Sequence, residues 1–327
     1  MSCTASASSL TQWQNLAQQQ QLSQQAYWHI LLRYEDKQAQ NLHSSIQQAS
    51  FFVSSEGANN PQAELQATLN ALAHPDPTLK ADDTVACKFP ARVAWLRQQL
   101  QITEADVATT ACPALDAWLT GINPHQATLV FAADFINNPS SMFGHTLLRI
   151  ATPDPTEDTR LLAYAVNYAA QTNTSNGLEF AYKGLTGGYA GAFSILPYYE
   201  KVKEYNDFEN RDLWEYQLNL TPQEITQGLK HLWEIKTVNF PYYFLSSNCS
   251  YQLLGLLEAA RPNTYLRQDF PVYAIPTDTL RRVLQEKNIL KKLVYRPASG
   301  TSLAYHAQQN KPHINDLAKK LAIDPNI

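Results

Sequence analysis

Several features are missing from this 327-residue sequence, and each absence excludes a class of protein. The sequence has no run of roughly 18 or more apolar residues, so we expect no membrane-spanning helix. Lys and Arg number 25 against 29 Asp and Glu, and the resulting net charge of -4 argues against a dedicated nucleic-acid binder. The eight histidines form no HExxH pattern and the cysteines no Cys-x-x-Cys pattern, so we predict no metal site.

The glycines do not form a phosphate-binding loop. Gly184–Gly191 is the segment richest in glycine, but it lacks the Lys-Ser/Thr pair that ends a P-loop. We therefore predict no nucleotide and no other cofactor. The segment is typical of a mobile or close-packed loop rich in aromatic residues. Tyr189 and Phe193 then either wall an apolar substrate groove or belong to an ordinary core.

A secretory leader is missing as well, because Met1–Ala7 carries neither a basic nor an apolar stretch. The chain is then either cytoplasmic, or periplasmic with its leader absent from this sequence. Cysteine is scarce, and Cys87 and Cys112 flank one short helical stretch far from Cys249. A disulfide between Cys87 and Cys112 closes a loop of about 25 residues, stabilises the fold by roughly 3 kcal/mol and favours an oxidising compartment. Two buried free thiols are the alternative.

The composition is globular, with 44% apolar and 17% charged residues over a length that suits two domains. Residues 1–120 are predicted to be a helical region, with helices at 10–33, 61–69, 89–100 and 113–119. Residues 121–300 form the second predicted domain, with strands or helices at 127–132, 146–151, 161–170, 211–220, 221–238, 242–245 and 250–260. Residues 301–327 are expected to be a C-terminal tail or linker. The predicted fold class is α+β, a helical region followed by an antiparallel sheet and a helix that carries a nucleophile.

Two residues with the chemistry for acyl transfer occupy suitable predicted elements. Cys249 opens the last of these helices, where unpaired N–H groups and the helix dipole stabilise a thiolate. His145 begins the second strand and can take the thiol proton. Asn248 and Ser250 flank the thiol, as a helix cap or as neighbours of an oxyanion. Taken singly, Cys249 is better explained as a buried small residue and His145 as a hydrogen-bonded core histidine, so the pairing carries the hypothesis.

The histidine precedes the cysteine in this chain, the reverse of the order in papain. That order points to a circularly permuted papain-like fold, in which a residue on the strand after the histidine orients the imidazole. Asn167 is the first choice because its amide oxygen accepts from a ring N–H, and Tyr164 is the second. A structural Asn at a strand end is the alternative. Arg149 is either an ion-pair residue or a headgroup ligand, and Arg149 and Tyr164 are also candidates for the substrate groove.

Four motifs give this region a recognisable order. They are SMFGHTLLRI, YKGLTGGY, ENRDLWEY and SSNCS, at residues 141–150, 182–189, 209–216 and 246–250. Together they resemble the Lnb-type N-terminal periplasmic domain family, long catalogued as a domain of unknown function. The resemblance covers residues 120–295, and the segments around Cys87 and Cys112 look like the helical region that often precedes this domain in Gram-negative proteins.

The resemblance implies a chemistry. The Asn-Cys pair at a helix start is also similar to that of lecithin:retinol acyltransferases, which share the permuted fold with NlpC-type cell-wall peptidases. In those relatives a cysteine forms a thioester and a histidine acts as base, which implies these roles for Cys249 and His145. The family's namesake moves a fatty acyl chain onto the N-terminal cysteine amine of a lipoprotein. Its periplasmic domain precedes membrane-spanning segments that this sequence does not contain.

We therefore predict a periplasmic, cysteine-dependent acyl-transfer enzyme that acts through a thioester on lipid, lipoprotein or other envelope acyl and amide substrates. Peptidoglycan peptides are the second substrate class, and they would make the protein an NlpC-type amidohydrolase. A non-catalytic envelope binding module is the competing class, and a cytoplasmic thiol hydrolase is the third. No nucleic-acid partner is expected, whereas peripheral contact with a membrane is compatible with lipid substrates.

Overall fold

The computed structural model describes residues 7–35, 42–107, 109–133, 143–153, 159–172 and 176–324. Its strands are β1 (Tyr34–Glu35), β2 (His43–Ser44), β3 (Gln126–Ala132), β4 (His145–Ala151), β5 (Tyr164–Gln171), β6 (Tyr189–Pro197), β7 (Leu213–Leu218), β8 (Phe240–Tyr242) and β9 (Leu290–Arg296). The first two form a small ribbon, and the others form a seven-stranded antiparallel sheet of order β8-β6-β5-β4-β3-β7-β9. The predicted α+β class is confirmed.

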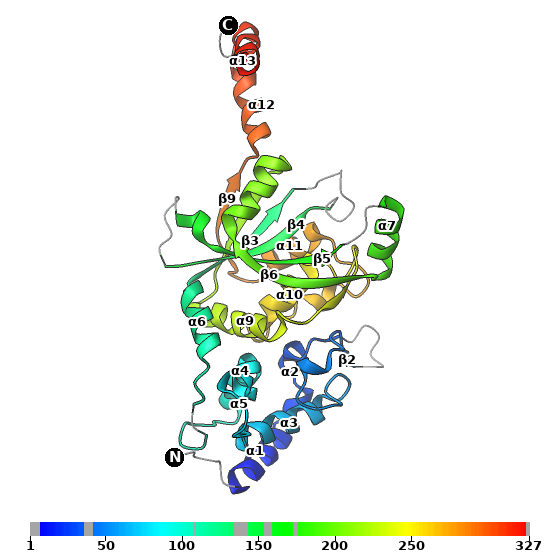
Figure 1. The fold of residues 1–327 in the computed structure, drawn as a ribbon, viewed down its shortest axis with the longest axis vertical. Coiled ribbons are helices and arrows are strands. Elements are labelled where there is room, and N and C mark those ends of the chain that lie inside the picture. The colour runs from blue at the N-terminus through cyan, green and yellow to red at the C-terminus, as the bar shows by residue number, and fades with distance from the viewer. Residues whose placement is uncertain are drawn as a thin grey trace.

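The helices fall into three groups along the chain. The N-terminal group is α1 (Ala7–Gln19), α2 (Ala26–Leu31), α3 (Pro61–Ala73), α4 (Val85–Lys88), α5 (Pro90–Gln99) and α6 (Pro113–Ile122). The middle group is α7 (Gly177–Thr186), α8 (Tyr198–Val202), α9 (Pro222–Ile235), α10 (Cys249–Ala260) and α11 (Pro276–Gln285), followed by α12 (Ser299–Gln309) and α13 (Pro312–Ile323). In Figure 1, α9 and α10 lie between the N-terminal helices and the sheet, and α12 and α13 project from the opposite end.

Different elements cover the two faces of the sheet, as the alternation of side chains along a strand requires. Leu129 of β3 and Leu148 of β4 belong to the main hydrophobic cluster, which also contains the leucines of α9 and α10. Val130 and Leu147 point to the other face and pack with Tyr198 of α8 in a second cluster. The central strands are thus buried on both sides, which explains their continuous apolar sequences.

Most predicted elements are present within a few residues of the expected bounds, including α3, α5, β3, β4 and α10. The start of α9 is fixed by a capping box, in which the Thr221 hydroxyl accepts from the Glu224 N–H and the Glu224 carboxylate accepts from the Thr221 N–H. Pro222 at the first helical position completes the signal that the sequence carries.

The single helix expected over 10–33 is two helices, α1 and α2. Gln21 adopts the left-handed region, with φ of 51°, and a 3₁₀ turn follows before Gln25 becomes extended. The break lets Trp13, Leu22 and Trp28 all enter the core, where none is more than 4% exposed. Burial of three large side chains outweighs the helix propensity of the glutamine-rich segment.

The segment around Gly184–Gly191 is not a loop, and the sequence-based interpretation was wrong there. It contains the end of α7 and the start of β6. Gly187, with φ of 78°, ends α7 in the left-handed conformation that glycine adopts without strain. Gly191 faces Tyr168, whose hydroxyl would lie 2.1 Å from a Cβ at that position, so glycine is needed for β6 to pack there. The glycines therefore mark a helix end and a close contact.

The N-terminal helices are joined to the sheet region by buried charged groups. Arg33 donates from Nε to His231 Nε2 at 3.0 Å, and His231 Nδ1 lies 3.1 Å from Glu234 on α9. Glu234 also accepts from the backbone N–H groups of Ala91 and Arg92, at 2.7 and 3.0 Å. The contacts of Arg33 with His231, and of Glu234 with the backbone at Ala91 and Arg92, cross the boundary, so each region supplies hydrogen-bond partners to buried groups of the other.

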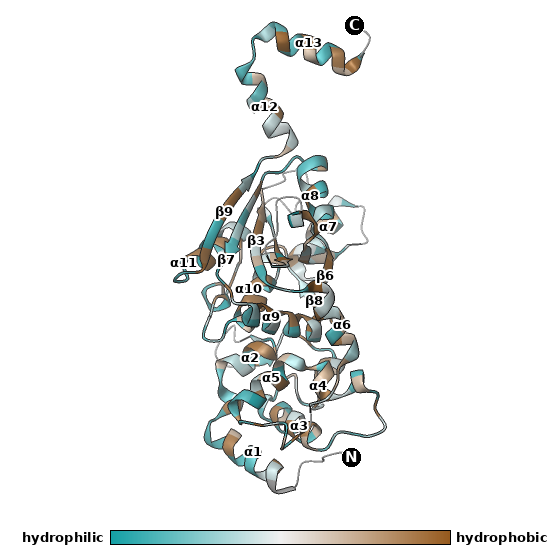
Figure 2. Ribbon diagram, turned by 90° about the vertical axis from the view of Figure 1, so that its left-hand side faces the viewer, coloured by the Kyte–Doolittle hydropathy of each residue, from teal (hydrophilic) through white to brown (hydrophobic). Residues whose placement is uncertain are grey.

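The expected C-terminal tail contains most of α12 and all of α13, whose apolar side chains are largely exposed. Figure 2 shows both helices extending away from the sheet. Within the described residues, no helix is long and apolar enough to cross a membrane.

Candidate active site

The thiol of Cys249 lies at the first residue of α10, and Asn248 holds that helix end in place. The Asn248 side-chain oxygen accepts from the N–H groups of Ser250 and Tyr251, at 3.1 and 3.2 Å. Its amide nitrogen donates to the carbonyl oxygens of Phe244 and Ala274, at 3.0 and 2.7 Å. Asn248 is therefore a helix cap whose side-chain oxygen and nitrogen both have hydrogen-bond partners, and the Ser250 N–H is one of those partners.

The sheet opens beside this helix start. β5 pairs with β6 over eight residues, but its ladder with β4 has only three pairs and ends at Leu148–Val166. The first residues of β4 are thus left without partners on β5, and Cys249 lies against them. Thr146 donates to the Cys249 sulfur through its backbone N–H and through its hydroxyl, whose oxygen is 4.0 Å from Sγ. An interrupted ladder therefore supplies a free strand N–H to the thiol.

His145 connects the thiol to Asn167. His145 Nε2 lies 2.8 Å from Asn167 Oδ1, and the imidazole also forms a side-chain hydrogen bond with Cys249. Because an amide oxygen only accepts, Nε2 must carry the proton, which leaves Nδ1 to accept from the thiol. The structure therefore brings together the three residues expected to be catalytic, and the ring is in the tautomer that general-base chemistry requires.

The pKa values of the pair shift in opposite directions. Burial raises the pKa of Cys249, but the charge and hydrogen bond of His145, together with the Thr146 donors, lower it overall from 9.0 to about 7. Burial lowers the pKa of His145, but the neighbouring thiolate and the hydrogen bonds to Cys249 and Asn167 outweigh it and raise that pKa. A thiolate–imidazolium pair is thus accessible near neutral pH.

Comparison with known families shows which family the chain belongs to. The family model described as the Lnb N-terminal periplasmic domain matches residues 114–286, a span that contains His145, Asn167 and Cys249. The chain belongs to the Lnb N-terminal periplasmic domain family. This assigns it to the periplasm and the cell envelope. A domain of unknown function, DUF7843, matches residues 20–99. No curated protein and no solved structure gives a match.

Arg149 of this Lnb-type domain lies away from the thiol. It is four residues along β4 from His145, a distance of about 13 Å along a strand. Its guanidinium is 2.5 Å from Glu215 and donates to the Thr128 hydroxyl at 3.0 Å. Glu215 also accepts from Tyr198 at 2.9 Å. Arg149 is thus part of a buried ion-pair network that borders a polar pocket of about 400 Å³.

The other residues considered for a groove are mostly core residues. Tyr189 and Phe193 are 3% and 5% exposed and belong to the main hydrophobic cluster. Tyr164 packs against the same cluster and, by strand alternation, points to the face opposite Asn167. It therefore does not replace Asn167 beside the imidazole.

The ENRDLWEY motif of the family stabilises the frame around the site. Arg211 donates to the Ala133 carbonyl at 2.6 Å and pairs with Glu209 at 2.8 Å, which ties the segment before β7 to the end of β3. Asp212 accepts from the Ala298 N–H at 2.7 Å, so it fixes the chain after β9. These residues position the strands that carry the site without touching the thiol.

Sequence reasoning missed two residues that contact Cys249. Thr146 follows His145 directly, but its N–H is available only because the ladder with β5 stops short of it. Tyr242 on β8 accepts a hydrogen bond from the backbone N–H of Cys249. No sequence motif links Tyr242 to Cys249. Tyr242 reaches Cys249 because β8 forms one edge of the sheet, opposite the edge formed by β9.

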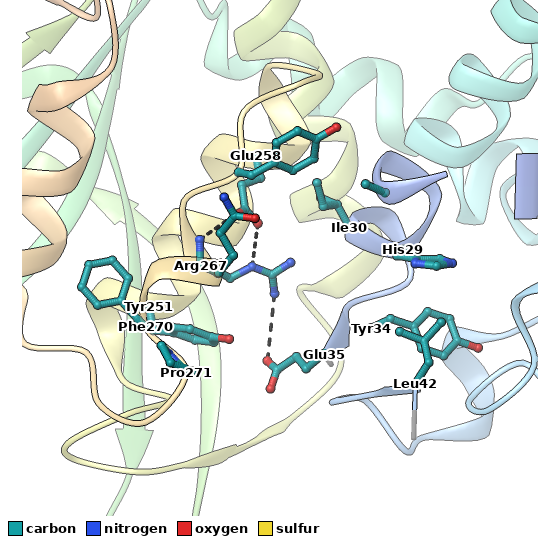
Figure 3. Close-up of a pocket in the computed structure, with 13 residues that line it drawn as sticks. His29, Ile30, Tyr34, Glu35, Leu42, Tyr251, Glu258, Arg267, Phe270 and Pro271 are labelled. Atoms are coloured by element: carbon teal, nitrogen blue, oxygen red, sulfur yellow. Dashed lines mark hydrogen bonds and ion pairs between the residues drawn. The ribbon is translucent and has the colours of Figure 1, made fainter. Parts of the chain in front are cut away.

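A second pocket, of about 270 Å³, lies where the N-terminal helices meet α10 (Figure 3). Arg267 donates to Glu258 at 2.6 Å, and its Nη1 lies 4.0 Å from Glu35. Tyr251 and Phe270 line the same pocket. Because the charged groups pair with one another, we interpret this pocket as part of the joint between the two regions.

Proposed function

We propose that the protein is a periplasmic cysteine-dependent acyl-transfer enzyme with a circularly permuted papain-like core. The observation that carries this proposal is the hydrogen-bonded series Cys249–His145–Asn167 at the start of a helix. A thiol with a lowered pKa, a base and a residue that orients the base are the three parts that nucleophilic catalysis needs. A purely structural role for these residues does not require that the unprotonated nitrogen of His145, Nδ1, faces the thiol of Cys249.

The reaction follows from these positions. His145 takes the thiol proton, and the Cys249 sulfur bonds to the carbonyl carbon of an ester or amide, which forms a tetrahedral oxyanion. The bond to the leaving alcohol or amine then breaks, and His145 returns the proton to that group. An amine or water, deprotonated by His145, attacks the thioester and releases Cys249. Asn167 holds the imidazole of His145 in one orientation during both the formation and the breakdown of the thioester.

The side chains beside the thiol favour an apolar acyl group. Thr146, Phe131, Trp214 and Tyr295 are direct cross-strand partners on β4, β3, β7 and β9, so they form one row on the α10 side of the sheet. The rings are 6.2 Å apart from Phe131 to Trp214 and 5.2 Å apart from Trp214 to Tyr295. We refer to these three rings as the aromatic row.

The length of the aromatic row suits a fatty acyl chain. Three strand spacings of roughly 4.8 Å give about 14 Å, and an extended chain of about a dozen carbon atoms spans that distance. Tyr295 is 47% exposed, so the outer end of the row is open to solvent. The aromatic row therefore favours lipid or lipoprotein acyl groups over peptidoglycan peptides as substrates.

The rate of Cys249 alkylation as a function of pH tests this proposal. Iodoacetamide should label Cys249 with a midpoint near pH 7, because the pKa of the thiol is lowered to about 7. His145→Ala should move the midpoint upward, since the main group that lowers the pKa is removed. Peptide mass spectrometry measures the rate, and Cys249→Ala gives the background. A slow thiol that is indifferent to His145 contradicts the proposal and favours a binding module.

A further inference from the structure

The helix start at Cys249 offers fewer oxyanion donors than its sequence implies. The N–H groups of Ser250 and Tyr251 are both taken by the Asn248 side chain. The N–H of Gln252 is taken by the Asn248 carbonyl, as the first bond within the helix. Cys249 itself has the remaining N–H of this turn, and its partner is the hydroxyl of Tyr242. One backbone donor alone is a weak oxyanion site, since such sites generally use two.

Tyr242 is held rigidly where a second donor is needed. The side chain is 3% exposed, and its ring stacks on Tyr168 with a centroid distance of 5.6 Å and an interplanar angle of 12°. The β8 strand that carries it pairs with β6, with Tyr242 opposite Tyr189. Burial, and then the nearby Cys249 thiolate, raise the pKa of Tyr242 well above its ordinary value. The phenol therefore keeps its proton and can donate it in a hydrogen bond.

We propose that the hydroxyl of Tyr242 and the backbone N–H of Cys249 together bind the carbonyl oxygen of the substrate as it becomes an oxyanion. In the free enzyme the Tyr242 oxygen accepts from the Cys249 N–H. A substrate oxygen takes that N–H and receives the phenol O–H as a second bond. Both bonds strengthen as negative charge develops, which is the condition for a contribution to rate rather than to binding. This inference rests on the proposed thiol chemistry and assigns a further catalytic residue to it.

Tyr242→Phe tests the inference because it keeps the stacked ring and removes only the hydroxyl. With p-nitrophenyl butyrate, the variant should acylate Cys249 about 100-fold more slowly or worse, with kcat reduced and KM little changed. Alkylation by iodoacetamide forms no oxyanion, so its rate and pH midpoint should stay as in the unchanged protein. That result also shows that the variant is folded around the thiol.

Tyr168→Phe is the matched control. Tyr168 lies against Tyr242 and is equally buried, but its hydroxyl has no hydrogen-bond partner in the part of the chain that the structure describes. Its removal should leave acylation and alkylation unchanged. Normal acylation by Tyr242→Phe overturns the role of Tyr242 and leaves the thiol chemistry standing. A protein that is alkylated quickly but is never acylated by the ester overturns both proposals together.

Discussion

The neutral side chain of Asn167 determines which nitrogen of the His145 imidazole carries the proton. Its oxygen accepts from His145 Nε2 at 2.8 Å, and the acceptor keeps the proton on that nitrogen. Without the Asn167 oxygen, the neutral imidazole can carry its proton on Nδ1 instead. A protonated Nδ1 cannot accept a hydrogen bond from the Cys249 thiol. In the proposed mechanism, His145 then carries its proton on the wrong nitrogen for part of the time and cannot take the proton of the thiol.

We therefore expect Asn167→Leu to lower the acylation rate roughly 100-fold, since loss of ring alignment has an effect of that order. The p-nitrophenyl ester assay at pH 7 measures it. Asn167→Asp is the control, because a carboxylate still accepts from Nε2, so most of the rate should be retained. Equal losses in the two variants would show that Asn167 acts through packing and not as an acceptor.

The residues that the sequence made visible differ from those that it did not. Cys249, His145 and Asn167 stand out because each is a reactive or polar residue at the start or in the interior of an apolar element. Thr146 reaches the thiol through a backbone N–H that the short β4–β5 ladder leaves free, and Tyr242, on an edge strand of the sheet, contacts the backbone N–H of Cys249. Both relations arise from strand register, which a local pattern does not encode.

At the scale of elements, β6 and β9 are strands that the local pattern did not reveal, and β6 shows why. The sequence of β6 begins with small residues after a glycine pair, which is typical of a loop, yet eight of its nine residues pair with β5. Tertiary contacts determine that this segment is a strand, because glycine at position 191 leaves space for the side chain of Tyr168. The start of α9 is the opposite case, because a complete capping box is a local signal and predicts the helix start correctly.

The aromatic row is also a property of elements, and it leads to a prediction about substrate length. Trp214→Ala removes the middle ring, so kcat/KM for a dodecanoyl ester should fall about tenfold, in line with the loss of about 1.5 kcal/mol of apolar contact. The value for an acetyl ester should not change, because that group ends before Trp214. Steady-state kinetics over a series of p-nitrophenyl esters measures the difference.

Trp118→Ala is the control for this series, because Trp118 packs against Trp233 beside the disulfide, with ring centroids 5.3 Å apart. Its loss should affect all chain lengths alike. An unchanged length preference in Trp214→Ala would place the acyl chain elsewhere and leave the thiol chemistry unaffected.

At the scale of the whole molecule, the N-terminal helices and the Lnb-type domain share one core. The main hydrophobic cluster runs from Trp13 of α1 to Ile289, just before β9, and includes residues of α9 and α10. Arg33 reaches His231, and Tyr27 donates to the Ala259 carbonyl at 2.5 Å. We therefore expect one cooperative unfolding transition, in which far-UV circular dichroism and the exposure of Cys249 to a thiol reagent change together.

The disulfide between Cys87 and Cys112 is present, as predicted, and it encloses α5. α5 carries Arg92, whose side chain is completely buried and pairs with Glu64 at 2.9 Å. Reduction frees a loop with a sequence separation of 25 in the unfolded chain, which should lower the free energy of unfolding by roughly 3 kcal/mol. Urea unfolding with and without a reductant measures this as a lower midpoint.

The double variant Cys87→Ala, Cys112→Ala provides the control, since a reductant should not destabilise it further. Because Arg92 lies inside the closed loop and Glu234 on α9 binds its backbone N–H, the loss of the bridge should weaken both regions and not the N-terminal helices alone. Thiol exposure at Cys249 should therefore shift to lower urea together with the helical signal. If the helical signal shifts and Cys249 exposure does not, the two regions unfold separately and the shared core is not cooperative.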